Sequence, residues 1–324
     1  MVHSHHSHSG QYVSHAVDTL EQVIDKVKLM NFKTFCLTEH VPRYSAETLY
    51  PEEIAKGYTP NNLIDNFNNY YKHAIQIQKI VNNDESNGLK ILVGFEIEGG
   101  IDAFHLDKCL QLKQDLKPDV IVGSVHHLNG IPIDFDRESW LNAKGTDTFK
   151  DFYKRYFQTV LIMISKLKPE IIGHLDLIRL MVDLTNDRCE ITGKLIDDVN
   201  IELDWPDVWN IIVQIVEMSV EQGTLIELNS AAIRKGWSSP YPKKDIVELV
   251  LSKGGKFCLS DDSHGLSQIG LNYEKVLKYI KSFHNFEKLY YWDIDLNGDC
   301  FVSSVDIKQL ELDPFWLNYT TSTN

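Results

Sequence analysis

The sequence of 324 residues lacks the motifs of several common enzyme classes. It has no GxxxxGK[ST] loop, no GxGxxG segment after a predicted strand and no GxSxG turn, so nucleotide-driven and serine-hydrolase chemistry have no support. Its five cysteines include no CxxC pair, which excludes zinc-finger spacing and indicates reduced thiols. It also lacks an apolar run as long as a membrane span and a signal-peptide core. We therefore expect a cytoplasmic protein.

Positive charge is also in short supply. Lysine and arginine number 32 against 46 aspartates and glutamates, which gives a formal net charge of −14. Because nucleic acid is bound largely through basic contacts to phosphate, so acidic a chain is a poor nucleic-acid binder. Any phosphate that it handles must be neutralised locally, by a metal ion or by arginine. No feature of the sequence indicates an oligomeric state.

Short β-rich runs alternate with longer helical segments along most of the chain. The runs are HSHHSHS at the N-terminus, 32–40, 90–98, 119–128, 170–178, 223–230 and 256–264, and the helical patterns include 19–31, 61–83, 205–223 and 242–254. This alternation implies parallel strands and βαβ units. The sequence therefore predicts a single α/β barrel domain over residues 1–324, with a peripheral insertion around 183–207 and a hairpin around 288–304.

Polar residues gather where each β-rich run ends. They are Glu39, His40, Glu96, Glu98, His126, His127, His174, Asp176, Glu227, Asn229, Asp262 and His264. In a parallel barrel the C-terminal ends of the strands point to one face, which is where active sites lie. We therefore expect these residues, which are far apart in the sequence, to form one site.

The N-terminal segment MVHSHHSHSG is rich in histidine. An H-x-H pair in an extended segment places both imidazoles on one face, where they can bind one ion. The alternative is a solvated polar N-terminus. Both His3 with His5 and His6 with His8 fit the spacing, and the second pair is favoured because a turn towards His15 then follows.

The strand ends add further candidate ligands. A carboxylate that ends an apolar run, such as Glu96, must be paired, protonated or metal-bound, and Glu98 is its rival because it has the same parity. A lone histidine at such a place is more often structural. The combined set of nine candidates is His6, His8, His15, His40, Glu96, His126, His174, Asp262 and His264. It suits two or three divalent ions (Zn, Fe or Mn), two of which Glu96 could bridge.

Arginine is scarce, and three arginines follow predicted strand ends. Arg43, Arg179 and Arg234 each lie just beyond such an end, on the side of the expected site. A guanidinium suits a phosphate because it donates two parallel hydrogen bonds. The alternative for each is a surface salt bridge. We take all three as candidate phosphate-binding residues.

These motifs resemble the histidinol-phosphatase branch of the polymerase-and-histidinol-phosphatase (PHP) superfamily, in its fungal form. The matching segments are HSHSGQYVSHA, CLTEHVPRY, GFEIE, GSVHHLNGIPIDFD, GHLDL, ELNSAAIRK, LSDDSHG and the closing DPFW, and they occur in the expected order over nearly the whole chain. The resemblance implies a distorted (β/α)7 TIM-like barrel of the PHP fold. It also implies a trinuclear metal site at the C-terminal ends of the strands.

The resemblance divides the nine candidate ligands among three ions. One ion would take His6, His8, Glu96 and Asp262, a second Glu96, His126 and His174, and the third His15, His40 and His264. The implied reaction is the hydrolysis of L-histidinol phosphate to L-histidinol and phosphate, a step of histidine biosynthesis. Arg234 would help to hold the phosphate.

Two parts of the implied mechanism stay open in the sequence. The proton for the leaving alcohol could come from His264 or Asp262. The imidazole and amine of this small phosphomonoester need an acidic or aromatic pocket, for which Glu98, Asp134 and Tyr44 are available. The alternative functions are another PHP-type phosphoesterase, acting on nucleotides or single strands, and a non-catalytic metal-binding relative. Neither a nucleic-acid nor a membrane partner is expected.

Overall fold

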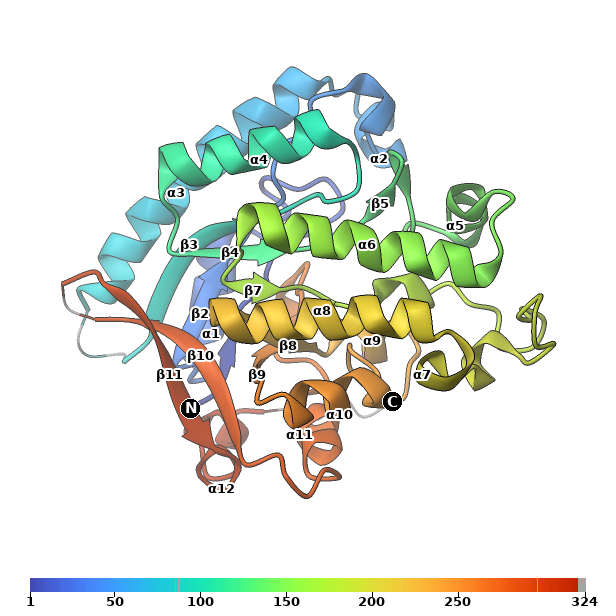
Figure 1. Cartoon of the computed structure of the whole chain (residues 1–324). Coiled ribbons are helices and arrows are strands. Elements are labelled where there is room, and N and C mark those ends of the chain that lie inside the picture. Colours follow the sequence, from blue (N-terminus) through green and yellow to red (C-terminus); the bar gives the residue numbers. More distant parts are fainter. Residues whose placement is uncertain (85, 87, 296, 320–324) are drawn as a thin grey trace.

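The centre of the molecule is a barrel of parallel strands surrounded by helices (Figure 1). The computed structural model describes residues 1–84, 86, 88–295 and 297–319. The barrel strands, in order around the sheet, are β1 (His3–Ser4), β2 (Thr34–Leu37), β3 (Lys90–Glu96), β4 (Val120–Gly123), β7 (Ile171–Ile172), β8 (Leu225–Asn229) and β9 (Lys256–Ser260). All neighbouring pairs are parallel. The seven strands expected from the sequence are confirmed.

The first and last strands approach each other beyond their paired ends. Ser7 and Ser263 form a parallel bridge, and the backbone N–H of His8 donates to the carbonyl of Ser263 at 2.8 Å. This bridge nearly closes the sheet into a barrel, at the end where the candidate site residues lie. The predicted α/β barrel of seven parallel strands is therefore confirmed.

Amphipathic helices cover the outside of the barrel (Figure 1). The longer ones are α1 (Leu20–Leu29), α3 (Pro60–Asn82), α4 (Ala103–Leu116), α5 (Arg137–Lys144), α6 (Phe149–Leu167), α8 (Pro206–Gln222), α10 (Lys244–Ser252) and α11 (Tyr273–Ile280). Helix α8 buries Val208, Ile212 and Ile215 at helical spacing, which turns one stripe towards the barrel. Among the residues that the structure describes, no helix combines the length and the apolarity that a membrane crossing requires.

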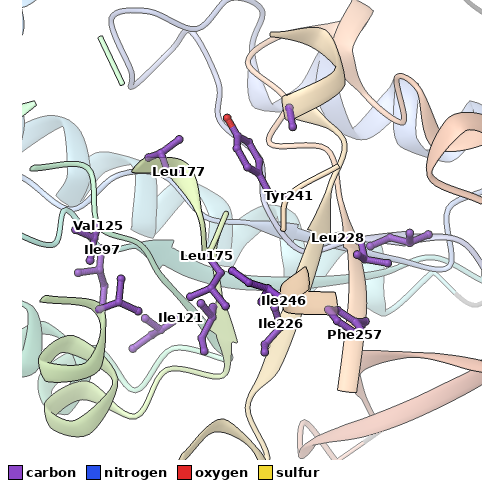
Figure 2. Packing of buried hydrophobic residues seen from close by; sticks show 14 of the residues in the cluster. Ile97, Ile121, Val125, Leu175, Leu177, Ile226, Leu228, Tyr241, Ile246 and Phe257 are labelled. Atoms are coloured by element: carbon purple, nitrogen blue, oxygen red, sulfur yellow. The ribbon is translucent and has the colours of Figure 1, made fainter. Parts of the chain in front are cut away.

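Alternate residues of each strand face the barrel interior. The interior cluster comprises Cys36, Leu92, Val120, Val122, Ile171, Leu225 and Cys258, while intervening residues join the outer core. Figure 2 shows part of that outer core, where Ile226 of β8 lies near Ile246 of α10 and Ile121 of β4 belongs to the same cluster. Further along the strands, the inward positions are polar, as at Glu96 and Glu227. Parity thus makes the barrel interior apolar at one end and polar at the other.

A hairpin covers the apolar end of the barrel. Its strands β10 (Lys288–Ile294) and β11 (Cys300–Asp306) are antiparallel. Tyr290, Trp292 and Val302 of this hairpin pack against the interior cluster, and in Figure 1 it crosses the barrel near the N-terminus. The polar end therefore remains as the open face of the barrel.

Shorter elements connect the main ones. Within the described residues they are α2 (Pro51–Ala55), α7 (Ile201–Asp204), α9 (Ala231–Arg234), α12 (Ile307–Leu310), the two-residue strands β5 (His127–Leu128) and β6 (Ile131–Pro132), and five 3-10 turns. The segment 183–207 contains a bridge from Arg188 to Leu195, one such turn and α7. Of these elements, α2 contributes Glu52 and α9 contributes Arg234 to the cavity at the polar end, and Asp134 and Phe135 of this cavity follow β6.

Candidate metal centre and substrate cavity

Glu96 lies at the centre of a ring of histidines. It ends β3, it is buried, and its Oε1 lies 3.0 Å from His6 Nε2 and 3.2 Å from the Nε2 atoms of both His126 and His174. Its Oε2 lies 3.0 Å from His40 Nδ1. Burial alone favours a neutral carboxyl, but the charges of His6, His126 and His40 outweigh it and hold the pKa of Glu96 well below its usual range.

Four groups of three side chains around Glu96 could each hold a metal ion. They are His6–His8–Asp262, His6–Glu96–His174, His40–Glu96–His126 and His8–His40–His264, and within each group the ligand atoms lie within 4.8 Å of one another. These residues come from the N-terminal segment and from the ends of β2, β3, β4, β7 and β9. Eight of the nine candidate ligands are thus brought together.

The ninth candidate, His15, lies at the edge of this cluster. Its ring centroid is 5.3 Å from that of His40 and 5.0 Å from that of His264. Its Nδ1 lies 3.3 Å from Glu52 Oε1, a carboxylate on α2. His15 belongs to none of the four groups found among the described residues, although it lines the same cavity.

The donor set of this cluster fits divalent metal ions. Nε2 of His6 and both ring nitrogens of His8 are buried and make no hydrogen bond within the described part of the chain. Buried polar atoms normally have a partner, and imidazole nitrogens that converge with carboxylates form the mixed ligand set of Zn, Fe or Mn. The residues present therefore suit a multinuclear site with Glu96 as a shared ligand.

Asp262 takes its place through an unusual backbone conformation. Its φ of 48° lies in the left-handed region, which aspartate tolerates better than most residues. The Arg234 guanidinium donates to the carbonyls of Asp261 and Asp262, at 3.1 and 3.0 Å, and so braces this turn. Although burial opposes ionisation, the charge of His6 and the neighbouring His8 ring, whose Nε2 lies 3.5 Å from Asp262 Oδ1, hold the pKa of Asp262 well below its usual range.

Three buried carboxylates form an outer layer behind the histidines. Glu39 Oε2 lies 3.4 Å from His8 Nδ1, Glu227 Oε2 lies 3.3 Å from His6 Nδ1, and Glu98 Oε2 lies 3.4 Å from His126 Nδ1. Carboxylates in this relation orient histidine ligands. Glu39 and Glu227 were expected at this end of the barrel but were not among the nine candidate ligands. Each is a carboxylate next to an apolar strand, which is a signal of pairing.

His3 and His5 contact neighbouring strands instead of the candidate metal centre. His3 Nε2 accepts from the backbone N–H of Leu259 at 2.9 Å, and His5 Nε2 accepts from that of Trp292 at 3.0 Å. Burial lowers the pKa of His5 to about 4, so its ring stays neutral. Both histidines thus bind backbone groups of β9 and β10 and stand outside the four groups.

Two of the three expected phosphate-binding arginines lie elsewhere. Arg43 is buried between Glu53 and Glu98, so Glu98 also faces a cation and two histidines instead of the cavity. Arg179 pairs with Asp245 at 2.7 Å and lines a separate groove on the outside of the barrel. Both guanidiniums form ion pairs with carboxylates, and neither lines the cavity at the candidate metal centre. Arg234 does line it.

A cavity of about 460 Å³ opens over the candidate metal centre. Glu96, His126, His174 and Asp262 line it together with two further groups of side chains. The basic group is Arg234 and Lys235, and the acidic-aromatic group is Tyr50, Glu52, Asp134 and Phe135. The rings of Tyr50 and Phe135 are stacked with an interplanar angle of 10°. A small molecule with an anionic end and a cationic, aromatic end matches this lining.

Comparison with known proteins places the chain in a family. The family model described as the PHP domain matches residues 4–231. The chain belongs to the PHP family. Within that family, the histidinol-phosphatase of Saccharomyces cerevisiae is 37% identical over 336 aligned residues, which cover 98% of this chain and 100% of the relative. A histidinol-phosphatase relative in Schizosaccharomyces pombe is 36% identical over 281 residues, 86% of this chain and 85% of the relative. The resemblance inferred from the motifs is confirmed.

Solved PHP structures share the barrel. A histidinol phosphatase structure from Listeria monocytogenes superposes with a TM-score of 0.67 and 23% identity, over 84% of this chain and 98% of that chain. The histidinol phosphate phosphatase of Lactococcus lactis, solved with zinc, L-histidinol and phosphate, gives a TM-score of 0.58 and 17% identity over 87% and 93%. At these identities the likeness establishes the fold.

Proposed function

We propose that this PHP protein is a histidinol-phosphatase, which hydrolyses L-histidinol phosphate to L-histidinol and phosphate in histidine biosynthesis. The observation that carries the proposal is a single cavity that combines a His/carboxylate metal centre, a basic group and an acidic-aromatic group. The substrate carries complementary groups, namely a phosphate, an amine and an imidazole. The full-length similarity to yeast histidinol-phosphatase supports the same reaction.

The proposed cofactor is two or three divalent ions, of Zn, Fe or Mn. The residues that would hold them are His6, His8, His40, Glu96, His126, His174, Asp262 and His264, with His15 at the edge. Such ions supply positive charge beside the phosphoryl oxygens and make a water molecule acidic enough to act as a nucleophile near neutral pH. The zinc in the Lactococcus protein supports this choice of ions.

Arg234 is the proposed phosphate-binding residue of the chain. Two of its N–H groups donate to the carbonyls of Asp261 and Asp262, and the guanidinium has five N–H donors in all. The remaining donors are held in a fixed orientation at the cavity. A pre-oriented guanidinium can bind the non-bridging phosphate oxygens and stabilise the charge that they carry in the transition state.

His264 and Asp262 are poorly suited to protonate the leaving alcohol. His264 Nδ1 lies 2.9 Å from the carbonyl of Asp262, so this nitrogen is the donor and Nε2 carries the lone pair. Burial and the neighbouring His8 hold the pKa of His264 well below its usual range. Because the carboxyl of Asp262 is also held ionised, the roles that fit both residues are those of metal ligands.

The acidic-aromatic group is the proposed site for the amine and imidazole. Glu52 and Asp134 provide negative charge at the cavity, and Tyr50 and Phe135 provide stacked rings. Tyr44, expected from the sequence as a contributor, instead packs against His105 outside the cavity lining. The negative charges also disfavour a polyanionic strand, which supports a small-molecule substrate over nucleic acid.

A cytoplasmic location is part of the proposal. The five cysteines are all free thiols, four of them buried, which suits a reducing compartment.

The reaction is tested by comparing substrates on the purified, metal-loaded protein. Phosphate release from L-histidinol phosphate is expected to exceed release from nucleoside monophosphates and from single-stranded oligonucleotides. Efficient cleavage of another phosphomonoester, without release from L-histidinol phosphate, would rule out the assignment.

A further inference from the structure

Arg43 is a buried cation that contacts two different parts of the site. Its Nη1 donates to Glu98 Oε1 at 3.0 Å, and its Nη2 donates to Glu53 Oε1. The guanidinium carbon also lies 4.1 Å from the centre of the Tyr50 ring, a cation–π contact. Glu98, Glu53 and Tyr50 are themselves buried. Arg43 therefore joins groups that are separate in the sequence.

One side of this junction leads to the metal centre. Glu98 Oε1 lies 2.8 Å from His40 Nδ1, and Glu98 Oε2 lies 3.4 Å from His126 Nδ1. The histidines His40 and His126 form one of the four candidate metal groups together with Glu96. Glu98 thus lies between Arg43 and two proposed ligands, where it can fix the orientation of both imidazoles.

The other side leads to the wall of the substrate cavity. Helix α2 has only five residues, which is too short to be stable alone. Glu53 of this helix accepts from the backbone N–H of Tyr50 at 2.8 Å as well as from Arg43. The neighbouring Glu52 reaches His15, and the hydroxyl of Tyr50 donates to Glu98 Oε2 at 3.3 Å. The position of α2 therefore depends on buried polar contacts around Arg43.

We propose that Arg43 is a positioning residue that couples the wall formed by Tyr50 and α2 to the metal-binding pair His40 and His126. Removing its charge leaves Glu98 and Glu53 buried without their cation, which is costly in a low-dielectric interior. Glu98 is then no longer held against the two histidines, and α2 is no longer held against the barrel. The inference rests on the proposed metal-dependent function, but it concerns metal binding and wall order, which can be measured without substrate.

The test uses the full-length protein with Arg43→Met, Arg43→Lys and Glu53→Gln. Arg179→Met is a matched control, because Arg179 is also a poorly exposed arginine beside two carboxylates, Asp176 and Asp245, and lies outside the cavity. Zinc affinity is measured by competition with a chromogenic chelator. Order in residues 50–55 is measured by amide hydrogen exchange on the zinc-loaded protein, since exchange reports local opening.

Arg43→Met is expected to weaken zinc binding by about 10–100-fold, as for outer partners of metal ligands, and to speed exchange in residues 50–55. Arg43→Lys should bind zinc more tightly than Arg43→Met and exchange more slowly in residues 50–55, without reaching the wild-type values. Glu53→Gln should speed exchange in residues 50–55 and raise KM while zinc affinity stays as in the wild type. Arg179→Met should lower Tm without changing either readout.

Unchanged zinc affinity in Arg43→Met would overturn the proposal, as would a loss that Arg179→Met reproduces. If Arg43→Met does not fold, unchanged amide exchange of residues 50–55 in Glu53→Gln would also overturn the proposal. Failure of the wild type to cleave L-histidinol phosphate would count against the proposed function alone.

Discussion

Glu227 Oε2 lies 3.3 Å from His6 Nδ1, on the side of the ring opposite to Glu96, whose Oε1 lies 3.0 Å from Nε2. The other oxygen of Glu227 accepts from the backbone N–H of His174 at 2.6 Å and from Asn229 Nδ2 at 2.7 Å. One buried carboxylate of β8 thus orients one histidine and anchors the backbone of another. A residue of the barrel interior thus helps to position two of the candidate metal ligands.

Replacing Glu227 with Gln should weaken metal binding. The amide keeps the shape of the side chain but removes the charge that favours an N–H on His6 Nδ1, and loss of such a partner costs about 10–100-fold in affinity. Chelator competition measures the effect. Glu170→Gln is the control, because Glu170 accepts from Lys113 and Ile121 at the other end of the barrel. Equal zinc affinities for the two variants would contradict this role.

Replacing Arg234 with Met should lower kcat/KM for L-histidinol phosphate. A hydrogen bond to a charged group contributes about 1.5–3 kcal/mol, which corresponds to a loss of about 10–150-fold. Arg234→Lys should recover only part of the activity, because an ammonium cannot donate in the same planar fork. Arg188→Met changes an exposed arginine in the 183–207 segment and should be neutral in the same steady-state assay. Wild-type kinetics in Arg234→Met would show that Arg234 does not bind the phosphate.

Asp134→Asn should impair recognition of the cationic end of the substrate. We expect a higher KM for L-histidinol phosphate and an unchanged KM for an aryl phosphate that has no amine, because only the first ligand loses a charge partner. Steady-state kinetics with both substrates separates this effect from damage to the metal centre, which would lower turnover of both. A parallel change for the two substrates would mean that Asp134 does not read the amine.

Metal uptake should depend on pH. After chelation, burial opposes protonation of His8, but Asp262, Glu39 and Glu96 outweigh it and raise the pKa of His8 to about 10. A ligand histidine must be neutral, so each ion that binds displaces protons. Zinc affinity should therefore rise as pH increases from about 6 to 8. Calorimetry in buffers of different ionisation enthalpy counts the protons, and a count of zero would contradict the protonated state of the metal-free centre.

The strand ends could be predicted because two simple regularities place them. Parallel strands bring their C-terminal ends to one face, and alternation turns every second residue inward. Glu96 follows from both rules, because Leu92 of the same parity lies in the interior cluster. His174 follows only from its place beyond the end of β7, because Ile172, which has its parity, belongs to the outer core. Glu98 shares the parity of Glu96, yet β3 ends at Glu96 and Gly100 follows with φ of 88°. Alternation therefore no longer governs position 98, and the carboxylate points behind the histidines.

The roles of the arginines could not be predicted from the sequence. Arg43, Arg179 and Arg234 all follow a strand end, but an arginine there can face the cavity or a carboxylate of a neighbouring element. For Arg179 the decisive partner is Asp245 on α10, 66 positions away. Such pairings arise from the packing of helices and loops, which carries no periodic signal in the chain.

The sequence could not identify the donor of the leaving-group proton for a similar reason. His264 and Asp262 are two residues apart, and their spacing suits either ligands or acids. Our proposal that both are ligands rests on the folded backbone, in which Asp262 has a left-handed φ of 48° and its carbonyl lies 2.9 Å from His264 Nδ1. The lone pair at Nε2 then suits a ligand.

The most direct test of the account is metal content measured together with phosphate release from L-histidinol phosphate, on freshly purified wild type and on His40→Ala. The wild type should hold two or three divalent ions per chain, lose activity on chelation and regain it with Zn, Fe or Mn. His40→Ala should hold fewer ions and release phosphate far more slowly. Full phosphatase activity in metal-free protein, or unaltered activity in His40→Ala, would contradict the account.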